Sequence, residues 1–484
     1  MKRNGSRTVV ALVVAAGIAV TGAACSSSAS SSKGADGGAK GNGSSADGVA
    51  DGKPLDPSAT VTISIDGAPG ADQAANKATY ADDLQAFKIL YPNVTVNAKP
   101  YVGQVEDPPQ FTAMLKAHNE TGAFHAYFTD KNQVLDSGDA IDVSAYVNDQ
   151  TLPGFSQLLP GVKQNMQDGG KTFALPINYY NQGLIYNRDL FKKAGLDPDK
   201  PPTTWDEVEA AAAKISALGG GVTGYEDYSG GNTGGWHFAS EIVSLGGKVT
   251  TDDGKKAAFN SDQGKQVLQR LHDMRFKDNG IGATPVPKWD AAFPPLATGK
   301  VGMFIGAPDV IQHLVEVMGA DKGLYGMGPI PGASGPATGA LSGGDVYYFK
   351  KGLTPNQIKA LVAWIDFQYL TPGKGQFDFA RAKTLASSDK PAAIGLPQKF
   401  FWNPSSPQMA QVQSDLKTSA TLPVDQYAPF VNNPVPPVLE PAAAQQIYKV
   451  LDTAMSAAMT DSGADPAKLL GNAESQVNQI LANQ

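Results

Sequence analysis

The chain has 484 residues, of which 42% are hydrophobic and 18% are charged, a composition typical of a globular protein rather than of a disordered chain or a membrane-spanning bundle. This length exceeds what one hydrophobic core usually serves, and it predicts two lobes or domains. A formal net charge of −7 argues against a general affinity for nucleic acid, and a single cysteine excludes a disulfide framework and a cysteine-based zinc site.

The N-terminus has the pattern of an export signal. Three basic residues within the first seven positions precede an apolar run over residues 8–20, and small residues follow the run. The run is too short to cross a bilayer as a helix. We therefore expect residues 1–24 to be a signal peptide.

The only cysteine, Cys25, stands where the small residues end, and this pattern resembles the lipobox of bacterial lipoproteins, with Gly22 in place of the usual aliphatic residue. The resemblance implies cleavage before Cys25 and lipidation of its thiol. The mature protein would then be anchored at the outer face of the cell membrane; the alternative is secretion with an incidental free thiol. Residues 25–57 are rich in Ser, Gly and Ala, and we expect them to form a flexible linker after the anchor.

The folded body is expected to begin at residue 58 with a β-α-β unit. Apolar and polar residues alternate over residues 61–65, which predicts a strand that ends at Asp66. Apolar residues then recur at helical spacing over residues 80–91, and a second strand is expected at residues 94–96. This order predicts an α/β fold with a largely parallel sheet.

Three further helices are legible in the sequence. Thr204 and Glu207 have the spacing of a capping box, and the helix that follows ends at Gly219. Apolar faces at helical spacing predict two later helices over residues 358–369 and 447–455.

Several segments resemble a known family. Residues 186–191 (YNRDLF), 194–196 (AGL) and 202–207 (PTTWDE) look like the stretch shared by family 1 extracellular solute-binding proteins of ABC importers, which are maltose-binding-like and mostly carbohydrate-binding receptors. Residues 299–306 and 325–332 are similar to the strands that follow in that family. Each motif is loose, but their order along residues 58–484 is fairly specific.

The resemblance implies a two-lobed α/β fold of the periplasmic-binding-protein type (type II), with a ligand cleft between the lobes and a hinge that closes it. We place three crossings between the lobes near residues 176–182, 298–302 and 341–345. The first lobe is then expected to comprise residues 58–178 and 300–342, and the second lobe residues 179–299 and 343–484.

The implied function is capture of a sugar or oligosaccharide and its delivery to the membrane permease of an ABC transporter, by a monomer without cofactor, metal or nucleic-acid partner. Aromatic side chains pack on the apolar faces of a sugar ring, and carboxylates or amides pair with its hydroxyl groups. Eight residues are candidates for such contacts: Asp66, Asp130, Asn178, Tyr179, Tyr180, Trp236, Asp309 and Asp345.

Each candidate follows from its place in the chain. Asp66 ends a strand, where a turn or cap is the alternative, and Asp130 falls in what looks like the family's first-lobe contact loop. Residues 178–180 lie at the first expected crossing, where structural packing is the alternative, and Asp345 lies at the third.

The remaining two candidates have alternatives of their own. Trp236 follows a glycine-rich segment and either stacks on a ligand or anchors the next helix. Asp309 stands where relatives often carry a stacking tryptophan, so that a polar contact or a helix cap is expected there instead. For Trp402 and Tyr427, core packing is the better interpretation.

Two other functions stay open at this stage. One is a lipid-anchored glycoside hydrolase that uses two cleft carboxylates, for example Asp130 with Asp309 or Asp345. The other is a receptor for a non-sugar solute such as a peptide, a polyol or a phosphate ester. Enzyme motifs give no support: the S-x-x-K match at residues 387–390 lacks its companion elements, and the G-x-G-x-x-G match at residues 219–224 follows a helix.

Overall fold

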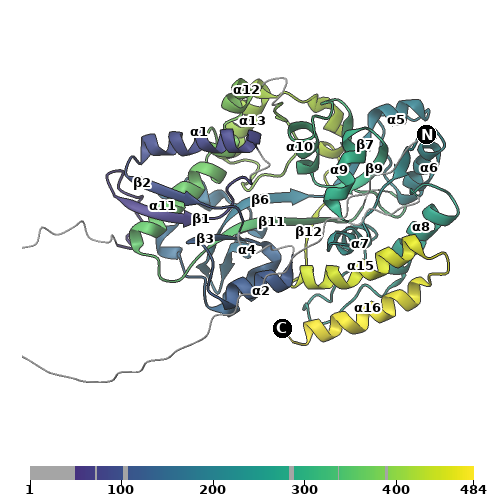
Figure 1. Ribbon diagram of the computed structural model, residues 1–484, viewed down its shortest axis with the longest axis horizontal. Coiled ribbons are helices and arrows are strands. Elements are labelled where there is room, and N and C mark those ends of the chain that lie inside the picture. The colour runs from purple at the N-terminus through teal and green to yellow at the C-terminus, as the bar shows by residue number, and fades with distance from the viewer. Residues whose placement is uncertain are drawn as a thin grey trace, which may run out of the picture. The chain divides into compact units, whose positions relative to one another are not determined.

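The computed structural model describes residues 49–70, 74–101, 107–282, 288–335, 337–386 and 391–483. The predicted signal peptide, Cys25, most of the predicted linker and the match at residues 387–390 lie outside the described residues. Within the described part, two β-sheets each have their own hydrophobic core, and the chain passes between them along two long strands, β6 (Ala174–Asn181) and β11 (Ala340–Phe349). These strands pair antiparallel and run side by side in Figure 1.

The first sheet has the strand order β12-β11-β3-β1-β2, and β6 pairs with β11. Its parallel part confirms the predicted β-α-β unit: β1 pairs parallel with β2 and with β3, whereas β11 lies antiparallel to β3. The strands not yet bounded are β1 (Val61–Ile65), β2 (Val94–Ala98), β3 (Ala123–Tyr127) and β12 (Pro437–Leu439).

Helices α1 (Ala74–Leu90) and α11 (Pro355–Ile365) contribute to the core of the first lobe through Phe87 and Trp364, whose ring centroids lie 5.1 Å apart. The predicted helix over residues 358–369 is confirmed, and its last part is the π-helical turn Asp366–Leu370. The other helices and the short hairpin of this lobe are α2 (Pro108–Lys116), α3 (Lys131–Ser137), α4 (Pro160–Met166), α12 (Phe379–Leu385), α13 (Pro407–Ser419), β4 (Gln167–Asp168) and β5 (Lys171–Thr172).

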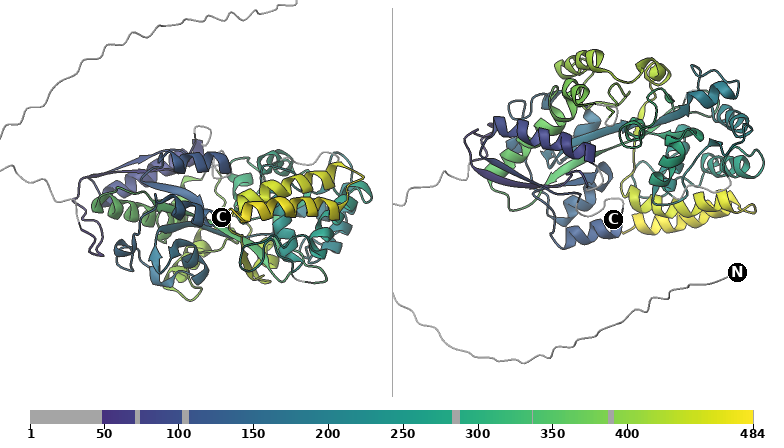
Figure 2. Two further views of the ribbon diagram at one scale, coloured as in Figure 1. Left: turned by 90° about the horizontal axis from the view of Figure 1, so that it is seen from below. Right: turned by 45° about the horizontal axis from the view of Figure 1, so that its top comes forward.

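The second sheet has the order β10-β7-β9-β8 and is covered by helices that include α6, whose capping box of Thr204 and Glu207 is confirmed. The predicted helix over residues 447–455 is also confirmed as part of α15, which lies beside α16 in every view (Figures 1 and 2). The elements are β7 (Gly183–Asn187), β8 (Thr223–Tyr225), β9 (Val301–Gly306), β10 (Tyr325–Gly328), α5 (Arg188–Lys193), α6 (Trp205–Ser216), α7 (Thr233–Ser244), α8 (Asp262–Phe276), α9 (Trp289–Ala297), α10 (Pro308–Glu316), α14 (Ala428–Val431), α15 (Ala444–Thr460) and α16 (Pro466–Leu481).

The predicted division into lobes is corrected by the strand pairing. Strand β9 belongs to the second sheet, between β7 and β8, so residues 298–302 are not a crossing and residues 300–339 do not join the first lobe. Conversely, residues 346–349 and helix α11 pack in the first core, although we expected them in the second lobe. The crossings near residues 176–182 and 341–345 are confirmed. A third lies in the C-terminal part, where residues 392–396 contribute to the cores of both lobes and Val412 is the last buried member of the first core.

The predicted linker ends earlier than residue 57. The side chain of Leu55 is buried in the first core at 2% exposure. Lys359 on α11 lies 2.6 Å from a carboxylate oxygen of Asp51, and the Asn148 amide donates to the Gly52 carbonyl at 2.8 Å. Residues 51–55 are therefore part of the folded body, because a single buried leucine and an ion pair hold them against the first lobe.

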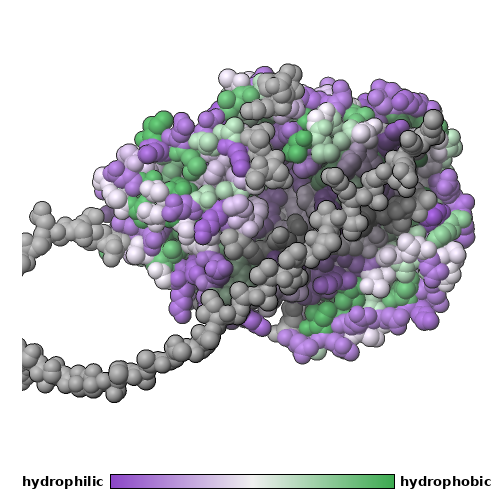
Figure 3. Space-filling model, in the orientation of Figure 1, coloured by the Kyte–Doolittle hydropathy of each residue, from purple (hydrophilic) through white to green (hydrophobic). Residues whose placement is uncertain are grey.

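None of the helices in the described ranges is long and apolar enough to span a bilayer. On the face drawn in Figure 3, hydrophilic and hydrophobic residues are interspersed.

Candidate functional site

A cavity of about 810 Å³ lies where the strand ends of the first lobe meet the second lobe, and we call it the cleft. Its first-lobe side is formed by the loop after β1, by Tyr101, and by His125 and Tyr127 of β3. Its floor is formed by Asn178 and Tyr180 of β6 and by Asp345 of β11, which are the strands that cross between the lobes. The volume is within the usual range for small-molecule sites.

The second-lobe side of the cleft is strongly aromatic. Tyr228, Trp236, Trp289 and Tyr448 line it, and the ring of Trp236 meets that of Tyr180 edge to face at a centroid distance of 6.2 Å. Such rings offer flat apolar surface together with hydroxyl and indole donors, which suits a ligand with both C–H faces and polar groups.

The glycine-rich segment before Trp236 is held by a carboxylate of α15. Asp452 accepts hydrogen bonds from the backbone N–H groups of Asn232 at 2.7 Å and Gly235 at 2.9 Å. A side chain at position 235 would overlap the backbone of Tyr448, so glycine there allows α7 to approach α15 closely. This packing fixes the start of α7 and thereby the position of Trp236.

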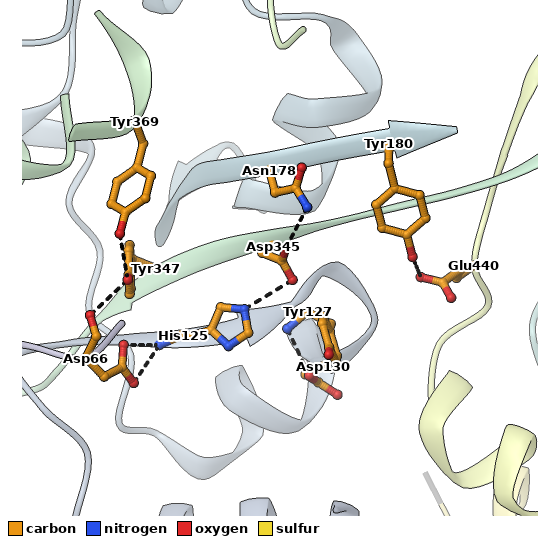
Figure 4. Close-up of polar contacts among 10 residues, drawn as sticks. All are labelled: Asp66, His125, Tyr127, Asp130, Asn178, Tyr180, Asp345, Tyr347, Tyr369 and Glu440. Atoms are coloured by element: carbon orange, nitrogen blue, oxygen red, sulfur yellow. Dashed lines mark hydrogen bonds and ion pairs between the residues drawn. The ribbon is translucent and has the colours of Figure 1, made fainter. Parts of the chain in front are cut away.

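Asp345 is the centre of a hydrogen-bond network on the first-lobe side (Figure 4). One carboxylate oxygen lies 3.1 Å from Nε2 of His125, and the other accepts from the Asn178 amide at 3.0 Å. Asp66 supports this arrangement from behind, since its carboxylate accepts the backbone N–H of His125 at 3.0 Å. Burial lowers the pKa of His125, but the hydrogen bond and charge of Asp345 outweigh that effect and raise the pKa above its usual value.

Glu440 joins two tyrosines at the other end of the floor. Tyr448 donates to one of its oxygens at 2.9 Å and Tyr180 to the other at 3.3 Å. A side chain at Gly343 would collide with both the Tyr180 hydroxyl and the Glu440 carboxylate, so glycine at this position makes room for their contact. Burial raises the pKa of Glu440 to about 7, while the two tyrosine hydroxyls act in the opposite direction.

Asp309 lies in the first turn of α10, behind Pro308, and its side chain lines the cleft. The residue is exposed to the water of the cleft, and the protein around its carboxyl group displaces part of the surrounding solvent. This desolvation raises its pKa to about 6. Its predicted role as a helix cap is not seen, because Ala307 is the N-cap residue of α10.

Five of the eight residues predicted from the sequence line the cleft: Asn178, Tyr180, Trp236, Asp309 and Asp345. Their contact with a ligand stays a prediction, but the structure brings them together from segments up to 167 residues apart, as the bond between Asn178 and Asp345 shows.

The other three predicted residues do not line the cleft. Asp66 is 1% exposed and holds β3, as described above. The Asp130 carboxylate is buried and accepts the backbone N–H of Tyr127 at 3.0 Å (Figure 4), so it stabilises the turn after β3. Tyr179 points to the opposite face of β6 from Tyr180 and packs near Phe128 in the first core. Trp402 and Tyr427 pack in the cores, as expected.

Several lining residues were missed by the sequence analysis. Glu440 and Tyr448 belong to the C-terminal segment, where only apolar periodicity was read, and Trp289 stands alone at the start of α9. His125 and Tyr127 alternate along β3 toward the cleft, so the two-residue period of a strand ending at a ligand site is a signal that pointed to them.

The sequence matches the family model described as bacterial extracellular solute-binding protein over residues 66–368. The chain belongs to this family. Its members are receptors that bind a solute, so the glycoside hydrolase considered above is not supported.

Two bacterial relatives show how far the similarity extends. A binding protein of Brucella abortus (strain 2308) is 33% identical over 216 residues, which are 43% of this chain and 47% of that protein. The sn-glycerol-3-phosphate-binding periplasmic protein of the same organism is 26% identical over 296 residues, 59% of this chain and 63% of the relative. The chain thus spans 47% of the length of the first relative and 63% of the length of the second.

Solved structures confirm the predicted fold. An ABC transporter solute-binding protein of Thermotoga lettingae bound with α-D-tagatose has a TM-score of 0.67 at 20% identity, over 87% of this chain and 99% of that one. The maltose-bound MalE3 protein of T. maritima has a TM-score of 0.66 at 19% identity, with the same coverage of both chains. At these identities the likeness establishes the periplasmic-binding-protein fold.

Proposed function

We propose that this solute-binding protein captures a sugar or oligosaccharide in the cleft and delivers it to the permease of an ABC transporter. The observation that carries the proposal is the chemistry of the lining: aromatic rings of Trp236, Tyr180 and Tyr228 stand among carboxylate and amide groups. A pyranose presents apolar faces and a ring of hydroxyl groups, and these surfaces match such a lining. Sugars and oligosaccharides are also the ligands named for several structural neighbours.

A phosphate ester is the second candidate, because the relative from Brucella is named for sn-glycerol-3-phosphate. The described lining residues include neither lysine nor arginine, the side chains that usually neutralise a phosphate. The N-terminus of α10, which could attract an anion, carries the Asp309 carboxylate in its first turn. These charges favour a sugar over a phosphate ester.

A thermal-shift screen followed by calorimetry would test the function. Neutral mono-, di- and oligosaccharides are compared with glycerol 3-phosphate, and the ligand is recovered and analysed after binding. We expect at least one carbohydrate to raise the melting temperature and to be recovered unchanged. Binding of glycerol 3-phosphate without binding of any carbohydrate would replace this proposal by the phosphate-ester alternative.

We also propose that the protein is a monomer held at the outer face of the cell membrane by lipidation of Cys25. The chain between Cys25 and the docked residues from Asp51 would then be the tether, shorter than the sequence predicted. Fractionation of cells that produce the wild type and Cys25→Ser tests this: the wild type is expected in the membrane fraction and the variant in the medium. The same distribution of the wild type and the variant would contradict the proposed lipid anchor at Cys25.

A further inference from the structure

The cleft carries more negative than positive charge on its described walls. Three carboxylates, Asp309, Asp345 and Glu440, line it, and His125 is the one basic side chain among the described lining residues. All three acids affect the pKa of the Tyr180 hydroxyl. Burial raises this pKa well above its usual value, and the charges of Glu440, Asp345 and Asp309 raise it further. The carboxylates are therefore close enough to act on one point of the floor.

Only one of the three carboxylates has a basic partner in the described structure. Asp345 is paired with His125, as shown above. Glu440 is bonded to two neutral tyrosine hydroxyls, and Asp309 forms no ion pair within the described residues. Two carboxyl groups without a basic partner in one cavity disfavour each other's ionised form, and burial already raises the pKa of Glu440 to about 7 and that of Asp309 to about 6. A ligand that supplies positive charge would stabilise both groups in the ionised form.

The aromatic lining is of the kind that receives a cation. Tyr180, Tyr228, Trp236 and Tyr448 place their rings around the same cavity as Glu440 and Asp309. The faces of such rings attract an ammonium group, and a nearby carboxylate adds a charge-assisted hydrogen bond. A neutral sugar uses the stacking surface and leaves this electrostatic complementarity unused.

From these observations we infer that the cleft selects a carbohydrate that carries a protonated amino group over its neutral parent, with Glu440 and Asp309 as the residues that determine this preference. The inference rests on the proposed function, because it assumes that the ligand is a carbohydrate. It names the ligand class more narrowly: an amino sugar, or an oligosaccharide that contains one.

The test measures affinity for matched sets of sugars by calorimetry at pH 7 and low salt. Each set contains a neutral sugar, the analogue with an amine in place of one hydroxyl, and the N-acetylated analogue, which keeps the substituent but not the charge. Glucose, galactose, mannose and β-1,4-linked glucose oligomers are all available as such sets. We expect at least one amine to bind about tenfold or more tightly than both neutral members of its set, and the preference to shrink at high salt.

Isosteric variants connect the preference to its residues. Glu440→Gln and Asp309→Asn each remove one ionisable carboxyl group from the cleft and should reduce the ratio of amine to neutral affinity by severalfold. Asp290→Asn is the control, since Asp290 follows the lining residue Trp289 but is itself 51% exposed and paired with Lys288. This variant should leave the ratio unchanged, because its charge is outside the cleft.

The outcomes separate the inference from the function. If neutral sugars bind as tightly as their amines, or more tightly, the inference is wrong and the proposed function stands. If Asp290→Asn lowers the ratio of amine to neutral affinity as strongly as the cleft variants do, the preference comes from the overall negative charge of the protein and not from Glu440 and Asp309. The inference is again wrong in that case. If no carbohydrate in any set binds, the proposed function fails, and the inference fails with it.

Discussion

Nε2 of His125 lies 3.1 Å from Oδ1 of Asp345, so a side-chain contact joins strand β3 of the first lobe to the strand that passes between the lobes. The register of β11 changes at this point, between Asp345 and Val346. The pair therefore lies near the end of β3, where β11 enters the first core and the floor of the cleft begins.

Asp345→Asn is expected to lower the pKa of His125, since the hydrogen bond and charge of Asp345 oppose the lowering of that pKa by burial. NMR titration of the imidazole measures the change. Affinity for the carbohydrate should fall as well, by about 1–3 kcal/mol, because a polar group of the floor is weakened.

Asp130→Asn is the control for that prediction. The charge of Asp130 also acts on His125, but its carboxylate bonds to the backbone of Tyr127 and not to the ring. A smaller decrease in the pKa of His125 and little change in affinity are expected. An unchanged His125 pKa in Asp345→Asn would contradict the assigned contact.

Tyr180→Phe and Tyr179→Phe form a matched pair on one strand. The first removes the hydroxyl that bonds to Glu440 in the cleft, and the second removes a hydroxyl on the opposite face of β6. Without this bond Glu440 is held less firmly at the cleft, so we expect a decrease in ligand affinity of about 0.5–1.5 kcal/mol for Tyr180→Phe only. Calorimetry with the same ligand measures both, and equal losses would show that the face of the strand does not matter.

The local elements of this protein could be predicted from its sequence. Alternation over residues 61–65 predicted β1, and the spacing of Thr204 and Glu207 predicted the start of α6, because both signals lie within a few residues. The placement of β9 could not be read in the same way. Its partners β7 and β8 are more than 70 residues away, and a buried strand with no polar alternation fits either sheet equally well.

The site was predictable in part for the same reason. Asn178, Tyr180 and Asp345 lie on the crossing strands, whose position follows from the chain order. Asp66 and Asp130 are predicted ligand contacts because they are acids that follow strands. In the structure their carboxylates instead accept hydrogen bonds from backbone N–H groups of β3. That competition depends on the approach of two segments in space, and no local pattern encodes it.

Leu55→Ala tests whether residues 51–55 belong to the folded body. The side chain is 2% exposed in the first core, so truncation leaves a cavity and should reduce the free energy of unfolding by about 2–4 kcal/mol. Denaturant titration of the purified protein measures the loss. Lys53→Ala, an exposed neighbour, is the control and should change stability by less than about 0.5 kcal/mol. Equal stability of the two variants would mean that residues 51–55 belong to the linker and not to the folded body.

The titration of Glu226 is expected to make the free energy of unfolding depend on pH. It follows β8, is 7% exposed, and its Oε1 atom has no hydrogen-bond partner within the described residues. Burial, with a further contribution from the charge of Asp227, raises its pKa from 4.5 to about 8. Between these two values the folded state holds a proton that the unfolded state has released, so this group makes the protein less stable as pH rises from about 4.5 to 8.

Glu226→Gln removes this dependence because the amide does not ionise. The free energy of unfolding of the variant, relative to that of the wild type, should increase with pH. This difference should level off above pH 8, after a change on the order of 1–3 kcal/mol. Urea unfolding at intervals from pH 5 to 9 measures the difference between the two proteins. Comparing the variant with the wild type at each pH cancels the titration of other buried groups, such as His237, whose pKa is lowered to about 4 chiefly by burial. Asp252→Asn, whose side chain is 85% exposed, should show a flat difference over the same range, and a flat difference for Glu226→Gln would mean that Glu226 is solvated.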